Sequence, residues 1–187
     1  EGFYTAPRFN LTRDSYAIVT EPANIDVDGD WDWIAWLRKR QSTDFLTIKV
    51  EGSSTNASKH VFLGIAEAND LRTYLQDVTY DEITDLDMRP ADLGYTTHAG
   101  TRRPELPTEQ TFWASSAHGS GTQKLRWSIE QGTYSLVLMN ADASQGVNLQ
   151  VAIGVKAPPV LGGISLGLLI GGLVLLGVGI LLIVLAV

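Results

Sequence analysis

The stretch Leu125-Arg-Trp-Ser-Ile-Glu-Gln-Gly-Thr-Tyr-Ser-Leu-Val-Leu-Met139 decides the fold class of this chain. Its first half alternates apolar Leu125, Trp127 and Ile129 with polar residues, and its second half resumes the same two-residue period at Tyr134. Such alternation is typical of strands that bury one face, and the Gln-Gly pair between the halves is typical of a turn. The stretch therefore predicts a β-hairpin with one buried face.

Further runs rich in β-branched and aromatic residues lie on both sides of this stretch and are separated by turn residues. The predicted strands are 16–20, 45–50, 60–65, 111–116, 125–129, 133–139 and 148–155. Many short strands at such intervals indicate a mainly β fold, and we expect a β-sandwich of the jelly-roll or immunoglobulin-like kind.

One short helix is expected to interrupt the strands. Leu71, Tyr74, Leu75 and Val78 have helical spacing, and Asn69 precedes them as a candidate N-cap. The stretch 81–109 has little periodicity, so we expect a long connection there that could serve as a partner surface.

The residues from Val160 onward are almost entirely apolar: VLGGISLGLLIGGLVLLGVGILLIVLAV, with Ser165 the only polar side chain and no charge. A bilayer core about 30 Å thick needs roughly 20 helical residues, so this run predicts a transmembrane helix. The chain then divides into a domain at 1–155, a linker at 156–159 and a membrane span at 160–187.

Glycines recur through this predicted span at helical intervals. Gly163, Gly167 and Gly171 are four residues apart, and Gly172 and Gly179 are seven apart on a neighbouring face. Small residues at such spacing let two helices approach closely within a membrane, so they predict a packing surface for another subunit or a second copy. The alternative is that glycine is simply frequent in membrane helices.

Charge is confined to the residues before the apolar run. The whole formal net charge of −7 lies there, so the average field of the domain does not favour nucleic acid or anionic headgroups. Because a long domain can be exported regardless of charge, we expect it outside the cytoplasm, held at the cytoplasmic membrane. The sequence starts at Glu1 rather than Met, which indicates either that a leader is removed or that the sequence is incomplete there, and it ends without a polar tail, so we expect further residues after Val187.

A weak calcium candidate lies at Asp26, Asp28 and Asp30, because alternating carboxylates resemble the oxygen ligands of a calcium loop. The match fails at Trp31, where that loop needs glycine, and at Leu37, where it needs an acidic ligand. A solvated strand face or turn is the competing explanation.

An aromatic and basic segment follows directly, and it combines residue types found at membrane interfaces and at sugar-stacking sites. Its members are Trp31, Trp33, Trp36, Arg38, Lys39 and Arg40. They predict either contact with lipid or a membrane partner, or a carbohydrate platform, or tryptophans in the core beside a basic turn.

Neither a catalytic centre nor a cofactor site is predicted. His60, His98 and His118 lack the spacing of metal ligands, and Ser120 lacks the Gly-x-Ser-x-Gly pattern of a nucleophile elbow. Cysteine is absent, which excludes disulfides and thiolate chemistry. We therefore expect a protein that is not an enzyme.

Six short segments of the sequence form a recognisable set: Gly2-Phe-Tyr-Thr-Ala-Pro, Ser15-Tyr-Ala-Ile, Val61-Phe-Leu-Gly-Ile-Ala with the following helix, Phe112-Trp-Ala-Ser-Ser, Leu125-Arg-Trp and Val137-Leu-Met-Asn-Ala-Asp. Together they resemble a family of uncharacterised actinobacterial membrane proteins. The resemblance covers most of the domain and implies an extracytoplasmic β-rich domain flanked by transmembrane helices. It implies no activity.

These patterns predict a non-enzymatic accessory or scaffolding subunit of a larger membrane protein complex. In this hypothesis the glycine-striped helix and the extracytoplasmic domain both contact the complex, and the lipid bilayer holds the anchor. The alternative is a membrane-tethered module that binds a glycan or another component of the cell envelope.

Overall fold

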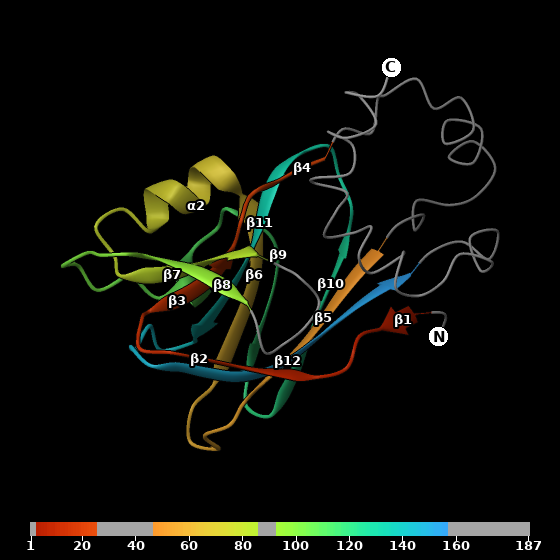
Figure 1. The fold of residues 1–187 in the computed structure, drawn as a ribbon, viewed down its shortest axis with the longest axis horizontal. Coiled ribbons are helices and arrows are strands. Elements are labelled where there is room, and N and C mark those ends of the chain that lie inside the picture. The colour runs from red at the N-terminus through yellow and green to blue at the C-terminus, as the bar shows by residue number, and fades with distance from the viewer. Residues whose placement is uncertain (1–2, 26–46, 86–92, 157–187) are drawn as a thin grey trace.

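Two β-sheets pack face to face in the computed structural model, which describes residues 3–25, 47–85 and 93–156 (Figure 1). One α-helix, α2 (Ala68–Tyr74), accompanies them within these residues. The prediction of a mainly β sandwich with one helix is confirmed. All seven predicted strands are present, with ends shifted by a few residues.

The smaller sheet, which we call sheet A, has strand order β1-β12-β5-β10, and β2 also pairs with β12. Every pair in it is antiparallel. Its strands are β1 (Phe3–Thr5), β2 (Phe9–Arg13), β5 (Thr47–Ser54), β10 (Thr122–Ser128) and β12 (Val147–Lys156).

The larger sheet, sheet B, has strand order β8-β7-β3-β11-β6-β9, and β4 also pairs with β11. Only the β3–β7 pair is parallel among the pairs of described strands. Its strands are β3 (Ala17–Thr20), β4 (Ala23–Ile25), β6 (Val61–Glu67), β7 (Tyr80–Asp85), β8 (Gly94–His98), β9 (Trp113–Gly119) and β11 (Gly132–Asn140).

The main core lies between the two sheets. Leu11, Val50 and Leu149 project from sheet A, and Leu63 and Leu138 project from sheet B, all of them buried. Each such side chain contributes about 1.5–3 kcal/mol of hydrophobic stabilisation when it is fully buried. The two-residue apolar period seen in the sequence therefore reports which side chains point between the sheets.

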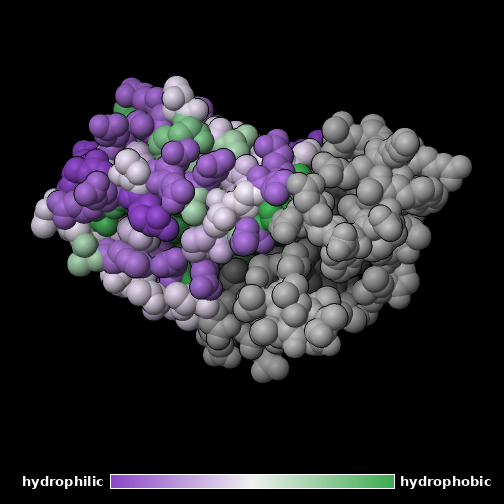
Figure 2. All heavy atoms as spheres, turned by 90° about the horizontal axis from the view of Figure 1, so that it is seen from above, coloured by the Kyte–Doolittle hydropathy of each residue, from purple (hydrophilic) through white to green (hydrophobic). Residues whose placement is uncertain are grey.

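A second apolar cluster covers the outer face of sheet B, where α2 lies (Figure 1). Leu71 and Tyr74 of the helix pack with Phe62, Val137 and Met139 of the sheet. Seen from above, the described residues present a mainly hydrophilic surface on this side, with apolar side chains only in small patches (Figure 2). The helix thus converts an apolar sheet face into a polar exterior.

The predicted N-cap of this helix is wrong. The helix begins after Glu67, and no side chain caps its first turn. Asn69 lies inside the helix, where its Oδ1 accepts a hydrogen bond from Arg72 at 3.0 Å. Because strand β6 leads directly into the helix, there is no turn in which a capping side chain could act.

The predicted hairpin at 125–139 is also wrong. Strand β10 pairs with β5 in sheet A, whereas β11 pairs with β3, β4 and β6 in sheet B. The turn at Gly132, whose φ is +140°, therefore carries the chain from one sheet to the other. Two consecutive strands bury alternate residues whether they pair in a hairpin or lie in facing sheets. The apolar period therefore does not distinguish these two arrangements.

The stretch 81–109, which was predicted to be a long connection, contains most of strand β7, strand β8 and the short 3₁₀-helix η1 (Pro107–Glu109). Strands β7 and β8 pair with each other, and Tyr80 lies opposite His98. Two acidic residues, Asp81 and Glu82, concealed the strand pattern of β7. Asp81 points inward and is buried. The Thr97 hydroxyl donates a hydrogen bond to its Oδ1, which offsets the cost of burying the carboxylate. A satisfied buried carboxylate does not appear apolar in a sequence pattern.

The segment after β8 is fixed against α2 by hydrogen bonds. The Arg102 side chain donates to the carbonyl oxygens of Tyr74 at 2.6 Å and Gln76 at 3.1 Å, at the end of the helix. The Tyr74 hydroxyl donates to the carbonyl of Glu105 at 2.6 Å. This segment and the helix together cover the outer cluster of sheet B.

In the three described ranges, no helix has the length and apolar character required to cross a bilayer. The predicted span at 160–187 lies outside the described residues.

Candidate functional site: the basic outer face of sheet A

The two sheets carry opposite charge. The strands of sheet A contain five basic residues (Arg13, Lys49, Lys124, Arg126 and Lys156) and one acidic residue, Glu51. The strands of sheet B contain four acidic residues (Glu67, Asp81, Glu82 and Asp85) and neither Lys nor Arg. The acidic average of the domain therefore conceals a basic sheet.

The pairing register shows which of these basic residues share a surface, because residues paired across strands point to the same side of a sheet. The first row across sheet A contains Phe3, Lys156 and Thr47, the second contains Thr5, Gly154, Lys49 and Arg126, and the third contains Ala152, Glu51 and Lys124. These rows form the outer surface, opposite the core residues Val50 and Leu125. We call the set Arg8, Lys49, Glu51, Lys124, Arg126 and Lys156 the basic face.

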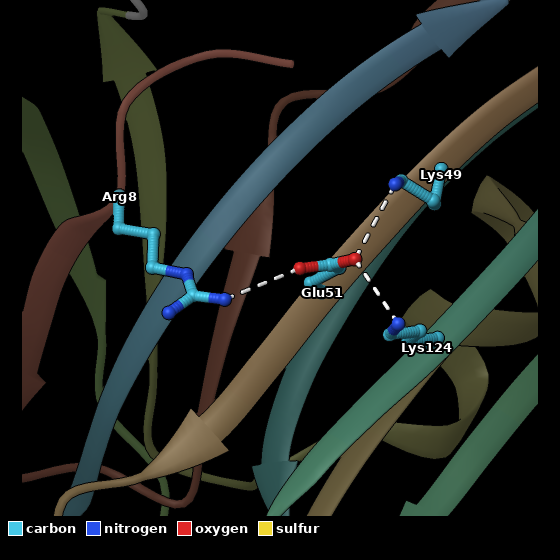
Figure 3. A network of polar contacts seen from close by, with 4 residues as sticks. All are labelled: Arg8, Lys49, Glu51 and Lys124. Atoms are coloured by element: carbon cyan, nitrogen blue, oxygen red, sulfur yellow. Dashed lines mark hydrogen bonds and ion pairs between the residues drawn. The ribbon is translucent and has the colours of Figure 1, made fainter. Parts of the chain in front are cut away.

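Glu51 is the centre of an ion-pair network on this face (Figure 3). Its Oε1 lies 3.3 Å from Lys49 Nζ and 3.7 Å from Lys124 Nζ, and its Oε2 lies 3.5 Å from Arg8 Nη2. Three strands or their connections thus direct cations toward one carboxylate. One negative charge cannot neutralise three positive charges, so the network keeps an excess of positive charge.

The pKa of Glu51 is lowered from its ordinary value. Burial acts in the opposite direction and would raise it, but the hydrogen bond and charge of Lys49, with help from Lys124 and Arg8, outweigh that cost. Side-chain exposure is 14% for Glu51 and 12% for Lys49, against 57% for Arg8 and 60% for Lys124. The inner pair is therefore structural, and the two outer cations are mostly in solvent.

Replacing Glu51 by glutamine is expected to lower the free energy of unfolding by about 2 kcal/mol at pH 7, because Lys49 loses its counter-ion in a nearly buried position. A carboxylate with a lowered pKa stabilises the fold above its ordinary pKa and loses that contribution as the pH falls. The difference between the two proteins should therefore shrink as the pH falls below about 4.5. Urea unfolding at pH 7 and at lower pH measures it.

Lys124→Gln and Arg8→Gln are the controls for this prediction. Both residues are largely exposed, so each change should cost about 0.5 kcal/mol or less. Equal losses for Glu51→Gln and for these two variants would show that the inner pair has no special role.

An aromatic side chain extends the basic face toward one end of the sheet. Lys49 Nζ lies 5.0 Å from the centroid of the Phe3 ring, and Arg126 Cζ lies 5.7 Å from it. Cations at such distances from an aromatic ring are attracted by the ring's quadrupole. The end of the sheet near Lys156 therefore combines a ring with three cations.

This end is also where the chain leaves the described domain. Lys156, the last residue of β12, pairs with Thr47, the first residue of β5, and with Phe3. Strand β4 ends at Ile25, which pairs with Gly132, where β11 begins after the chain has left β10 at Ser128. Segments 26–46 and 157–187 are thus both joined to the same end of the sandwich (Figure 1).

All of the sites predicted from the sequence lie outside the described residues. They are the calcium candidate (Asp26, Asp28 and Asp30), the aromatic and basic segment (Trp31, Trp33, Trp36, Arg38, Lys39 and Arg40) and the glycine stripe (Gly163, Gly167, Gly171, Gly172 and Gly179). These predictions stay predictions.

The three histidines lie on different strands or connections of sheet B. His98 contacts Glu82 at 2.8 Å and stacks on Tyr80 at 4.4 Å between ring centroids. His118 lies on β9, at the opposite edge of the sheet, and His60 precedes β6. In the part of the chain that the structure describes, no three His, Asp or Glu residues gather in a way that could hold a metal ion.

A polar cluster lies between the sheets at the β2 and β8 edges. The Arg13 guanidinium lies 3.5 Å from the centroid of the Tyr95 ring, and its Nε has no hydrogen-bond partner within the described ranges. The pKa of Tyr95 is raised from its ordinary value. Burial is the main cause and the charge of Asp81 adds to it, whereas Arg13 acts in the opposite direction. The Arg13 guanidinium of sheet A thus stacks on the Tyr95 ring of sheet B.

The basic face was missed by the sequence analysis, although part of its signal was present. Lys49 and Glu51, and likewise Lys124 and Arg126, are two residues apart and therefore share a side of their strand. Joining the two pairs required knowing that β5 and β10 are neighbours, although Glu51 and its register partner Lys124 are 73 positions apart in the sequence (124 − 51).

The fold and this face define the class: a β-sandwich domain with one basic and one acidic sheet among the described strands. Comparison with protein families and with curated proteins found no match for the chain.

Proposed function

We propose that the protein is a non-enzymatic accessory or scaffolding subunit of a membrane protein complex. The apolar run 160–187 is its transmembrane helix, and the β-sandwich is held outside the cytoplasm, as the resemblance to actinobacterial membrane proteins implies. The run is long enough to span a bilayer core of about 30 Å and carries no charge.

The observation that carries this proposal is the pairing of Lys156 with Thr47 at one end of sheet A. Only the residues 157–159 separate Lys156 from the apolar run, so this end of the sandwich faces the bilayer. The segment with Trp31, Trp33 and Trp36 is joined to the same end through β4 and β5. Tryptophans and basic residues are the types enriched where a protein meets a membrane interface, which supports contact there.

The proposed contact with the complex is made by the glycine stripe and by the domain. Without a hydrophobic drive between helices in lipid, close backbone approach at small residues supplies the packing energy. Gly163, Gly167 and Gly171 would form this contact surface. Its partner is a helix of another subunit or of a second copy.

The anchor is tested by alkaline carbonate extraction of membranes from expressing cells. The full chain should stay in the membrane pellet, because the insertion of a membrane-spanning helix is effectively irreversible. A chain that ends at Lys156 should appear in the soluble fraction. Release of the full chain by carbonate would contradict the proposal.

The packing role is tested by purification in mild detergent. The full chain should be recovered in a stoichiometric complex, and Gly167→Leu with Gly171→Leu should reduce that recovery because leucine keeps the helices apart. Leu169→Ile with Leu173→Ile, on another side of the same helix, is the matched control. Recovery of free monomer alone from the unaltered protein would refute the accessory role.

A further inference from the structure

We infer that the basic face of sheet A docks on the anionic lipid headgroups of the membrane that anchors the protein. This inference rests on the proposed function, because it requires residues 160–187 to hold the domain at a bilayer. It adds a second membrane contact, formed by folded strands, and thereby an orientation for the sandwich.

The first support is the distribution of charge along the strands. Lys156, Lys49, Arg126 and Lys124 all occupy the three rows nearest the end that leads to the apolar run. The rows beyond them contain Asn10, Gln150, Ser53 and Thr122, and then Thr12 and Asn148, without any charge. Among the described residues of this face, the positive charge thus increases toward the end that leads to the apolar run.

The second support is distance. Residues on one side of a strand are roughly 6.7 Å apart, so three rows, with two intervals between them, span only about 13 Å. Attraction between fixed charges persists over a Debye length of about 8–10 Å at physiological salt. A domain tethered just beyond Lys156 therefore keeps its cations where an anionic surface can attract them, whereas a neutral half-sheet lies farther away.

The third support is the shape and chemistry of the face. Small residues, Thr5, Gly154 and Ala152, lie between the cations in the pairing register, and Gly154 and Ala152 are buried among the longer side chains around them. Arg8 and Lys124 are largely exposed, and Glu51 is the only acidic residue on the strands of sheet A. A surface on which exposed Arg8 and Lys124 accompany one carboxylate and one ring, Phe3, suits a layer of anionic headgroups.

The test uses the full chain in lipid nanodiscs, and the absence of native cysteine allows single labels. A fluorophore is placed at Thr5→Cys, in the second basic row, or at Thr12→Cys, in the neutral half of the same face. Both threonines are exposed. Quenching by a headgroup-attached nitroxide then reports how closely each row approaches the bilayer.

In nanodiscs with anionic phosphatidylglycerol, the label at Thr5 should be quenched at least about threefold more than in purely zwitterionic nanodiscs. The label at Thr12 should respond less. The difference should disappear in about 0.5 M salt, because screening shortens the range of the attraction.

Arg8→Gln with Lys124→Gln should lower the docked-to-undocked ratio at least about tenfold, because each basic residue near an anionic surface contributes about a fivefold effect. Lys59→Gln with Arg72→Gln removes the same charge from the far turn and from α2, and should leave the ratio unchanged. Circular dichroism of every variant verifies that the fold is retained.

Equal quenching in anionic and zwitterionic nanodiscs would overturn the inference while leaving the anchor in place. That result would be expected if an acidic protein segment, rather than lipid, occupies the face. Failure of the full chain to enter nanodiscs of either composition would instead overturn the proposed function.

Discussion

Replacing Phe62 by alanine is expected to lower the free energy of unfolding by about 3–5 kcal/mol, the largest effect of any change considered for this domain. Phe62 is completely buried on the outer side of β6. Its ring lies 4.9 Å from the Trp113 ring and stacks against His118 at 6.4 Å. Truncation would leave a cavity beneath the helix and remove contacts that join β6 to the edge strand β9.

Phe62→Leu is the matched control, because it keeps most of the apolar volume and should cost less than about 1.5 kcal/mol. Urea unfolding of the full chain in mild detergent, followed by tryptophan fluorescence, measures both variants. A similar loss for alanine and leucine would mean that the aromatic contacts, rather than the filled volume, stabilise this cluster.

Gly100→Ala is expected to cost about 3 kcal/mol, because an added methyl group has no space. A Cβ at this position would lie 2.3 Å from the backbone carbon and oxygen of Asp77. Gly100 lies close to Asp77 because the segment after β8 packs there against the residues that follow α2. A β-bridge between Val78 and Arg102 joins the two segments at this point. Backbone atoms cannot move aside as a flexible side chain can, so the segment would be displaced from the helix.

Gly121→Ala separates this packing effect from the effect of backbone conformation. Gly121 has a φ of +66°, but a Cβ there would meet no atom within 4 Å. Its cost should be only about 1–2 kcal/mol, the penalty of a left-handed conformation. Thermal unfolding followed by circular dichroism compares the two variants, and equal losses would refute a steric role for Gly100.

Phe62 and Gly100 show which parts of the fold were predictable from the sequence and which were not. Phe62 falls in the run 60–65, whose β-branched and aromatic residues predicted a strand, and β6 is that strand. Strand β6 is buried on both faces because α2 covers the outer face of sheet B. Gly100 lies in the stretch predicted to be a long connection, and nothing in its local sequence indicates the helix end against which it packs.

Two of the five described strands that the sequence analysis missed, β7 and β4, share a physical cause. Strand β7 has acidic residues at Asp81 and Glu82, and one of them is buried because Thr97 on the neighbouring strand satisfies it. Strand β4 is short and depends on its pairing with β11. In both, the stabilising partner is distant in sequence, so a local pattern carries little signal.

By itself, the sequence determined which residues alternate between an interior and an exterior and where an apolar run long enough for a bilayer begins. Those properties depend on local period and composition. Only the tertiary structure decided that β10 and β11 belong to different sheets and that the cations collect on sheet A. Strand pairing joins residues far apart in the chain, and neither hydrophobic period nor net charge records which strands become neighbours.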